Sequence, residues 1–257
     1  MDSVTTICAL GDNYIYLYKC GQNNTFVVDP GDSSAVLSVL EERDLVLAAV
    51  LATHHHFDHT GGIRELKKKT GCEVIGLDRN TIPVTNRFVK GKDALEVCAT
   101  RIQVITTPGH TRDSVCYYLQ PSRDNQSGML FTGDTLFIGG CGRPIECDAQ
   151  TMWNSLRKIA GLPDDTLVYP GHDYTEENYE FALTIEPNNT TTKKRLQEIK
   201  ERQNQGRLTV PSTVAQEKTT NIFLRADTPA IKIAINAPNA VGAEVFAELR
   251  RRKNVFG

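Results

Sequence analysis

All six histidines of the chain lie in three short segments that also contain acidic residues. Four are in Thr53-His-His-His-Phe-Asp-His59, one is in Thr107-Pro-Gly-His-Thr111, and one is in Pro170-Gly-His-Asp173. Imidazole and carboxylate groups are ligands of borderline divalent metals such as zinc. With Asp134, which follows Gly133, the set is large enough to bind two ions.

The densest segment has the spacing of a metal-binding turn. The apolar run 45–52 predicts a buried strand, and His54 and His56 follow it two residues apart. Because the period of an extended chain is two, we expect their imidazoles on one side of the backbone. Asp58 and His59 precede a glycine-containing turn into a helix over 63–69, so they can reach a second ion. His55 should point away and contact other side chains.

The remaining candidate ligands follow predicted strands. His110 and His172 each come after a Pro-Gly pair, and Asp134 follows the strand 129–131. Loops at strand ends are where α/β proteins place functional side chains. One carboxylate can bridge two cations about 3.5 to 4 Å apart, and we expect Asp134 to do so. Taken singly, each histidine could be structural, but packing alone does not explain the whole set.

The elements predicted from periodicity form a strand-rich region followed by a helical one. We expect strands at 14–18, 25–28, 45–52, 73–76, 101–105, 115–119, 129–131 and 166–169, and helices at 33–42, 63–69 and 149–160. After His172 the pattern is helical, over 175–185, 190–204 and 241–252, with a loop at 226–240. The chain is therefore of the α/β class, with domains at 1–173 and 174–257.

Bulk properties exclude several classes of protein. A net charge of −2 and a pI near 6.3 argue against a nucleic-acid binder. The chain contains no apolar run of about 18 residues, so we expect no membrane span and a cytoplasmic location. Seven cysteines without CxxC spacing fit reduced thiols. A local basic cluster, Arg250 to Lys253, lies near the C-terminus.

The motifs together resemble the metallo-β-lactamase superfamily and, within it, the glyoxalase II (hydroxyacylglutathione hydrolase) family. The resemblance spans nearly the whole chain and is carried by the segments 53–62, 133–137, 140–142, 169–174 and 209–213 and by the basic C-terminal helix. It implies a four-layer αββα sandwich followed by a smaller all-helical domain that binds substrate.

The resemblance also implies a role for each candidate residue. One metal would be held by His54, His56 and His110, the other by Asp58, His59 and His172, with Asp134 between them. The ions would be zinc first of all, with iron or manganese as alternatives. Asp58 and Asp134 would be catalytic. Substrate would be bound by Arg143, Tyr174, Arg250 and Lys253, although Arg250 and Lys253 could instead be solvated charges on a terminal helix.

The implied reaction is hydrolysis of S-2-hydroxyacylglutathione thioesters by a metal-bound hydroxide, such as S-D-lactoylglutathione to D-lactate and glutathione. A thiolate leaves without much protonation, because the pKa of a thiol is about 8.5. The expected partner is this small molecule, with no nucleic acid, no membrane and a monomeric chain. Ile145 stands where the family often has an aromatic residue, which leaves the thiol carrier open.

Four other functions remain open from the sequence. A persulfide dioxygenase of the same fold would need one iron and three ligands, and a thioesterase could use a different thiol carrier. A nuclease of the superfamily would need a basic channel, which the net charge does not favour. A noncatalytic metal-binding scaffold is free to lose ligands, whereas this chain carries a complete set.

Overall fold

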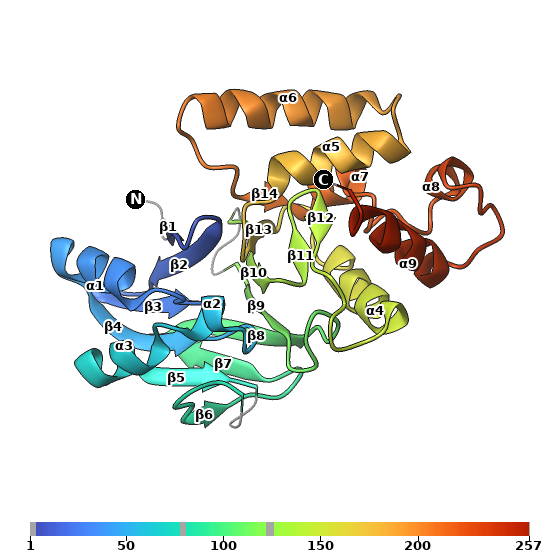
Figure 1. Ribbon diagram of the computed structural model, residues 1–257. Coiled ribbons are helices and arrows are strands. Elements are labelled where there is room, and N and C mark those ends of the chain that lie inside the picture. The colour runs from blue at the N-terminus through green and yellow to red at the C-terminus, as the bar shows by residue number, and fades with distance from the viewer. Residues whose placement is uncertain (1–3, 78–80, 122–125, 257) are drawn as a thin grey trace. The chain divides into compact units, whose positions relative to one another are not determined.

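A computed structural model describes residues 4–77, 81–121 and 126–256 (Figure 1). The chain forms two compact units that are interleaved along the sequence. The first comprises Met1–Thr106 and Asp113–Gly133, and the second comprises Thr107–Arg112 and Asp134–Gly257. The expected division into domains after residue 173 stays a prediction.

The first unit contains a mixed sheet whose strands follow one another in chain order. The three N-terminal strands are antiparallel and the later ones are parallel. The strands are β1 (Val4–Ala9), β2 (Asn13–Lys19), β3 (Asn24–Val28), β4 (Val46–Leu51), β5 (Glu73–Gly76) and β6 (Arg87–Phe88).

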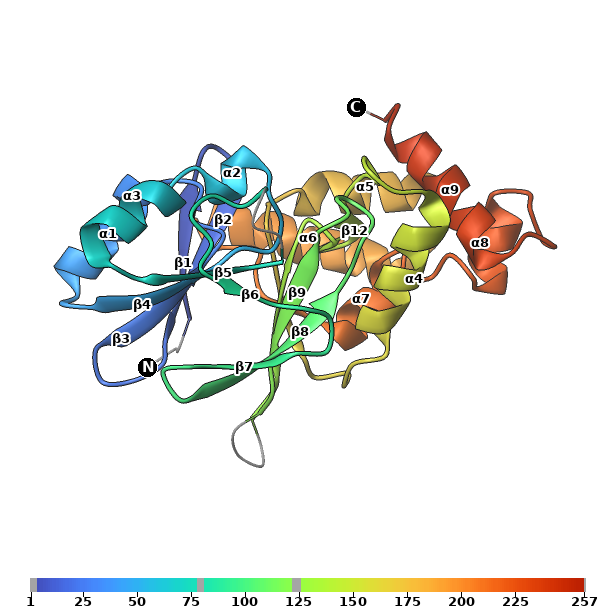
Figure 2. The ribbon, with the colours of Figure 1, turned by 90° about the horizontal axis from the view of Figure 1, so that it is seen from below.

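Helix α1 (Ser33–Glu42) lies in the crossover from β3 to β4, and α3 (Ile63–Thr70) lies in the crossover from β4 to β5. The Asp32 carboxylate caps α1 by accepting from the Ser34 and Ala35 amides, and Gly71 ends α3 at a φ of 71°. Both helices lie along one face of the sheet (Figure 2). Their apolar side chains form a continuous core with the sheet, which includes Val36, Leu40, Ile63, Leu66, Val27, Val50 and Val74.

Four further strands of the first unit form an antiparallel meander, β7 (Ala94–Val97), β8 (Thr100–Thr106), β9 (Val115–Leu119) and β10 (Met129–Gly133). The Tyr117 hydroxyl donates to the Ala52 carbonyl at 2.9 Å, and the rings of Tyr16 and Phe131 are 5.4 Å apart. These contacts pack the meander against the first sheet. The first unit therefore has three layers, one of helices and two of strands.

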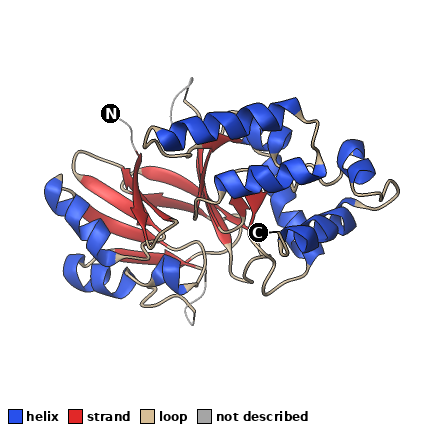
Figure 3. Cartoon of the chain, turned by 45° about the horizontal axis from the view of Figure 1, so that its top comes forward, coloured by secondary structure: helices blue, strands red, loops and turns tan. Residues whose placement is uncertain are grey.

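The second unit is mainly helical (Figure 3). It contains two short antiparallel strand pairs, β11 (Leu136–Phe137) with β12 (Gly140–Cys141) and β13 (Leu167–Pro170) with β14 (Ser212–Thr213). Its helices are α4 (Ala149–Ala160), α5 (Thr175–Ile185), α6 (Thr190–Asn204), α7 (Val214–Thr220), α8 (Pro229–Ala234) and α9 (Gly242–Lys253). Within the described ranges, every helix is too short or too polar to cross a membrane.

The expected helices at 175–185, 190–204 and 241–252 are confirmed within a residue, but the loop expected at 226–240 is wrong in part. That segment contains α8, which begins at Pro229, the position where proline suits a helix. Helix α7 was not expected either. It is capped by Thr213 and Gln216, whose side chains and backbone amides bond reciprocally.

A buried carboxylate joins two parts of the second unit. Glu217 on α7 is fully buried, and its Oε2 accepts from the Gly139 amide at 2.9 Å and from Asn221 Nδ2 at 3.0 Å. Burial raises the pKa of Glu217. Gly139 has a φ of 69°, and a Cβ there would lie 2.9 Å from the Tyr179 ring. The turn after β11 thus depends on both glycine and the carboxyl group.

Glu217→Ala should lower the free energy of unfolding by about 1 to 3 kcal/mol, because the Gly139 amide and the Asn221 side chain lose a buried acceptor. Urea denaturation at neutral pH measures this loss. Glu217→Gln keeps an acceptor oxygen and serves as the control. An alanine variant as stable as the wild type would show that the carboxyl group does not hold this turn.

Comparison of Glu217→Gln with the wild type also tests how the stability of the chain depends on pH. Because the pKa of Glu217 is raised in the folded chain, its contribution to stability is complete below the pKa of the unfolded chain and is lost as pH rises through the folded value. Glutamine does not titrate. The stability of Glu217→Gln relative to the wild type should therefore increase with pH above the ordinary range of a glutamic acid, and a constant difference would contradict the assignment.

Candidate metal centre and adjoining pocket

In the first unit, β4 leads directly into the histidine-rich segment. His54 Nε2 and His56 Nδ1 are 3.2 Å apart, so the two imidazoles do meet on one side of the backbone. Helix α2 (Phe57–Thr60) follows and carries Asp58 and His59, with His59 Nε2 3.4 Å from Asp58 Oδ2.

Two glycines allow this segment to turn. A Cβ on Gly61 would lie 2.8 Å from the Gly31 carbonyl oxygen, and one on Gly62 would lie 2.6 Å from the Pro30 carbonyl oxygen. Only glycine permits such close approach of two backbones. The turn thereby packs α2 against the loop that follows β3.

In the second unit, the Asp134 carboxylate lies close to two histidines. Its Oδ2 is 3.3 Å from His110 Nε2 and 3.4 Å from His172 Nε2, and all three side chains are buried. Gly109, which precedes His110, packs so closely that an added Cβ would lie 2.1 Å from Met152 Sδ. The Pro-Gly pair therefore lets the His110 loop lie on α4.

These spacings fit co-ligands of a metal ion. Two atoms that each lie about 2.1 Å from one tetrahedral ion are roughly 3.4 Å apart. The four close pairs, two in each unit, span 3.2 to 3.4 Å. The three histidine–carboxylate distances exceed the usual length of an N–H···O hydrogen bond. The donor types and their spacing thus fit divalent metal binding in each unit.

The other ring nitrogen of four histidines is already engaged. His110 Nδ1 donates to the Arg143 carbonyl at 2.8 Å, and His54 Nδ1 lies 3.0 Å from Thr53 Oγ1. His59 Nδ1 lies 3.1 Å from Asp29 Oδ2, and His172 Nδ1 lies 3.4 Å from the Tyr174 hydroxyl. Such partners set the tautomer and orientation of a metal-binding imidazole. In each case Nε2 is directed toward the other candidate ligands.

Asp29 is a functional candidate that sequence reasoning missed. It is buried at a φ of 51°, and it accepts from the Thr53 amide at 2.7 Å and from Thr53 Oγ1 at 2.6 Å in addition to contacting His59. Asn13 was also missed, and its Nδ2 is 3.2 Å from Asp58 Oδ2. The one available signal was Asp29-Pro-Gly directly after an apolar strand.

His55 differs from its neighbours. Its Nδ1 is 2.8 Å from Asp113 Oδ1, and Thr81 Oγ1 donates to the other oxygen of Asp113 at 2.9 Å. The side chain thus contacts a carboxylate of the first unit, and the expectation that it does not bind the metals stays a prediction.

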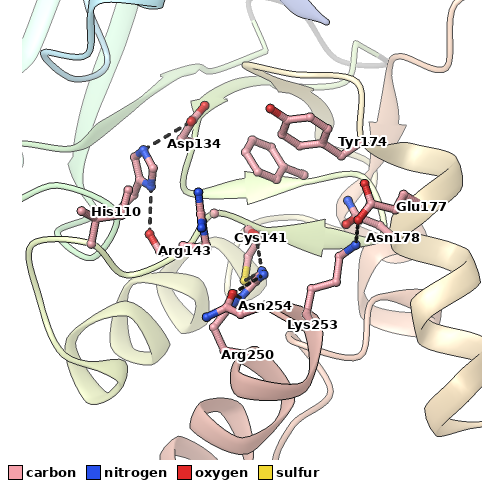
Figure 4. Close-up of a pocket in the computed structure, with 13 residues that line it drawn as sticks. His110, Asp134, Cys141, Arg143, Tyr174, Glu177, Asn178, Arg250, Lys253 and Asn254 are labelled. Carbon is pink, nitrogen blue, oxygen red and sulfur yellow. Dashed lines mark hydrogen bonds and ion pairs between the residues drawn. The ribbon is translucent and has the colours of Figure 1, made fainter. Parts of the chain in front are cut away.

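All four predicted substrate-binding residues line one cavity of about 280 Å³ in the second unit (Figure 4). His110 and Asp134 lie at the same cavity. Its other lining residues are Phe137, Cys141, Gly142, Ile145, Glu177, Asn178 and Asn254. Two candidate metal ligands and the four candidate substrate residues therefore line the same cavity.

The cations on α9 are buried, which argues against the alternative that they are solvated surface charges. Arg250 is 7% exposed and donates to the Cys141 carbonyl at 2.8 Å and to Asn254 Oδ1. Burial raises the pKa of Cys141 to about 11, so its thiol is protonated beside Arg250. Lys253 is 8% exposed and contacts Glu177. Buried cations at a cavity favour an anionic ligand.

Asp29→Ala should weaken metal binding by about 10- to 100-fold, because His59 and Thr53 lose the carboxylate that orients them. Competition with a chromophoric chelator measures the affinity. Asp32→Ala is the matched control, since it removes an exposed carboxylate three residues away that caps α1. Equal losses in both variants would count against an orienting role for Asp29.

Two family models together match nearly all of the chain. The metallo-beta-lactamase superfamily model matches residues 9–96 and 99–172, and the hydroxyacylglutathione hydrolase C-terminus model matches residues 173–256. These matches confirm the predicted fold class, an α/β metallo-β-lactamase fold followed by a helical C-terminal region.

Curated relatives match this chain over their full length. The chain is 43% identical to the hydroxyacylglutathione hydrolase of Photobacterium profundum, covering all of both chains, and 40% identical to that of Methylococcus capsulatus, covering 100% of this chain and 99% of the relative. Among solved structures, it resembles ETHE1 from Myxococcus xanthus with a TM-score of 0.69 and 27% identity, over 98% of this chain and 91% of the other. The chain belongs to the hydroxyacylglutathione hydrolase family of the metallo-β-lactamase superfamily.

Proposed function

We propose that this chain hydrolyses S-2-hydroxyacylglutathione thioesters, with S-D-lactoylglutathione giving D-lactate and glutathione in the second step of methylglyoxal detoxification. The observation that supports this most is the cavity lined by His110 and Asp134 together with Arg143, Arg250 and Lys253. A metal-binding group and three cations beside one hollow suit a ligand with a reactive acyl group and carboxylates. Full-length similarity to hydroxyacylglutathione hydrolases agrees.

Seven side chains would hold two divalent metal ions. We propose His54, His56 and His110 for one ion, Asp58, His59 and His172 for the other, and Asp134 for both. The family and the close histidine–carboxylate pairs support metal binding. When bound, such ions supply a hydroxide at neutral pH and polarise the substrate carbonyl. We expect zinc, with iron or manganese as alternatives, in a monomeric cytoplasmic protein.

The chain's own residues would orient the reactants. Asn13 Nδ2 contacts Asp58 Oδ2 at 3.2 Å, which holds this carboxylate in position to orient the attacking water. Arg143 and Arg250 would pair with carboxylates of the thiol carrier, and Tyr174 would contact it through its hydroxyl. The departing thiolate needs little protonation, since the pKa of a thiol is about 8.5.

The experiment that tests the function combines metal analysis with thioester assays. Purified protein should contain two metal ions per chain and should hydrolyse S-D-lactoylglutathione faster than thioesters of other thiols. Exhaustive chelation should abolish hydrolysis, and adding the metal back should restore it. Activity that survives complete chelation would refute the proposal, and oxygen uptake with glutathione persulfide would favour a dioxygenase instead.

Asp134→Ala should lower kcat by at least about a hundredfold and reduce the metal content, because His110 and His172 lose their shared carboxylate. Steady-state kinetics and metal analysis of the same preparation measure both effects. Asp165→Ala removes an exposed carboxylate and should match the wild type. An active Asp134→Ala variant with its full metal content would exclude the bridging role.

Arg250→Met should raise KM for S-D-lactoylglutathione by about tenfold or more with a smaller change in kcat. The reason is that a hydrogen bond to a charged group is worth about 1.5 to 3 kcal/mol and acts mainly on binding. Arg251→Met is the matched control, because Arg251 lies on the same helix, is exposed and pairs with Glu248. A KM that stays at the wild-type value in both variants would remove Arg250 from the binding site.

A further inference from the structure

The cavity that carries the cations also contains one acidic side chain on a helix. Glu177 lies in the first turn of α5 and lines the cavity, and its Oε1 contacts Lys253 Nζ (Figure 4). The two side chains differ in exposure, since the side-chain atoms alone are 7% exposed in Lys253 and 51% exposed in Glu177. The carboxylate therefore covers the ammonium group from the solvent side of the contact.

Lys253 is held where it is by aromatic rings. Its Nζ lies 5.1 Å from the centre of the Phe256 ring and 5.7 Å from that of Phe181. Cation–π attraction and burial of the side chain restrict the ammonium group to this place. A ligand that uses Lys253 must accordingly approach it at the position where Glu177 now contacts it.

The contacts of Arg250 differ from those of Lys253. Its guanidinium donates to neutral acceptors, the Cys141 carbonyl and the Asn254 amide oxygen, so its charge is not compensated by those contacts. Lys253 contacts a carboxylate instead. Of these two buried cations on α9, Arg250 thus attracts a ligand carboxylate strongly, and Lys253 does so less.

The consequence is a competition at Lys253. A carboxylate of the carrier would have to displace Glu177 or lie beside it, and like charges at short range repel. A neutral amide at the same place would meet no such repulsion and could still accept a hydrogen bond from the ammonium group. The charge of Glu177 therefore reduces the advantage of a carboxylate over an amide.

We propose that Glu177 is a specificity-determining residue that makes the cavity tolerant of thiol carriers in which one carboxylate is masked as an amide. This inference rests on the proposed function, because it names the class of carrier for that same site. The substrate class becomes acyl thioesters of glutathione and of its monoamide conjugates, with Arg250 retaining preference for the remaining carboxylate.

The matched control lies one residue away. Glu176 is on the same turn of α5, and its carboxylate pairs with Lys200 at 3.0 Å. It is not among the residues that line the cavity. Glu176→Gln and Glu177→Gln remove the same charge and keep the same side-chain volume, but only Glu177→Gln removes a partner of Lys253 at the cavity.

The kinetic test compares three substrates, S-D-lactoylglutathione and its two monoamides, amidated at either the glycine or the γ-glutamyl carboxylate. The wild type should hydrolyse one monoamide with a kcat/KM within about threefold of the free acid. Glu177→Gln should lower KM for the free acid by about threefold or more, leave kcat unchanged and raise the preference for the free acid over that monoamide. Glu176→Gln should change neither quantity.

Two kinetic results would overturn the proposal. One is an unchanged preference in Glu177→Gln, and the other is a higher KM for the free acid, which would mean that Glu177 merely supports Lys253. A calorimetric titration with glutathione and its monoamides provides a readout that does not need catalysis. There, Glu177→Gln should bind glutathione more tightly than the wild type does, and equal affinity or no binding to either protein would overturn the inference.

If the wild type binds glutathione but hydrolyses none of the three thioesters, the proposed function fails while the calorimetric preference still decides the role of Glu177. If hydrolysis proceeds and the preference does not change, the function stands and the role of Glu177 is refuted. The two proposals can therefore fail separately.

Discussion

The structure depends on holding imidazole nitrogens and carboxylate oxygens at the spacing of ligands that share a metal ion. In each unit these atoms lie 3.2 to 3.4 Å apart, in surroundings that bury most of them. Such spacing is stable only when neighbouring groups fix each side chain, because buried polar atoms are costly when misplaced. Asp29 and the Arg143 carbonyl do this for His59 and His110.

The helical part of the chain serves the same site through packing. Aromatic side chains of α4, α5 and α9 cluster around Phe223, whose ring lies 5.1 Å from the Arg250 guanidinium. This packing presents the buried cations of α9 to the cavity. Glu217 secures the turn between β11 and β12, so that Cys141 and its carbonyl lie where Arg250 can donate. A hydrophobic cluster thus positions the cations that line the cavity.

Much of the fold and of the candidate site could be predicted because the signals were local. Strand β4 is a continuous apolar run, α1 begins at a capping aspartate, and the histidines follow strands at turn-forming glycines. Helix α8 lies in a segment for which the sequence predicts a loop, because the helix has only six residues and the segment around it is rich in Pro, Ala and Asn. Strand β1 was missed although its β-branched residues favour a strand, and its pairing with β2 places it in the sheet.

The sequence by itself determined which chemistry the chain can perform, because ligand types, their spacing and their place at strand ends are local properties. Tertiary structure decided which other side chains contact these functional residues. Asp29 meets His59 only because β3 and β4 pair in parallel, so that their ends lie side by side. Glu177 meets Lys253 across 76 residues of chain. Such contacts arise from packing between distant segments, and no pattern within a short stretch of residues encodes them.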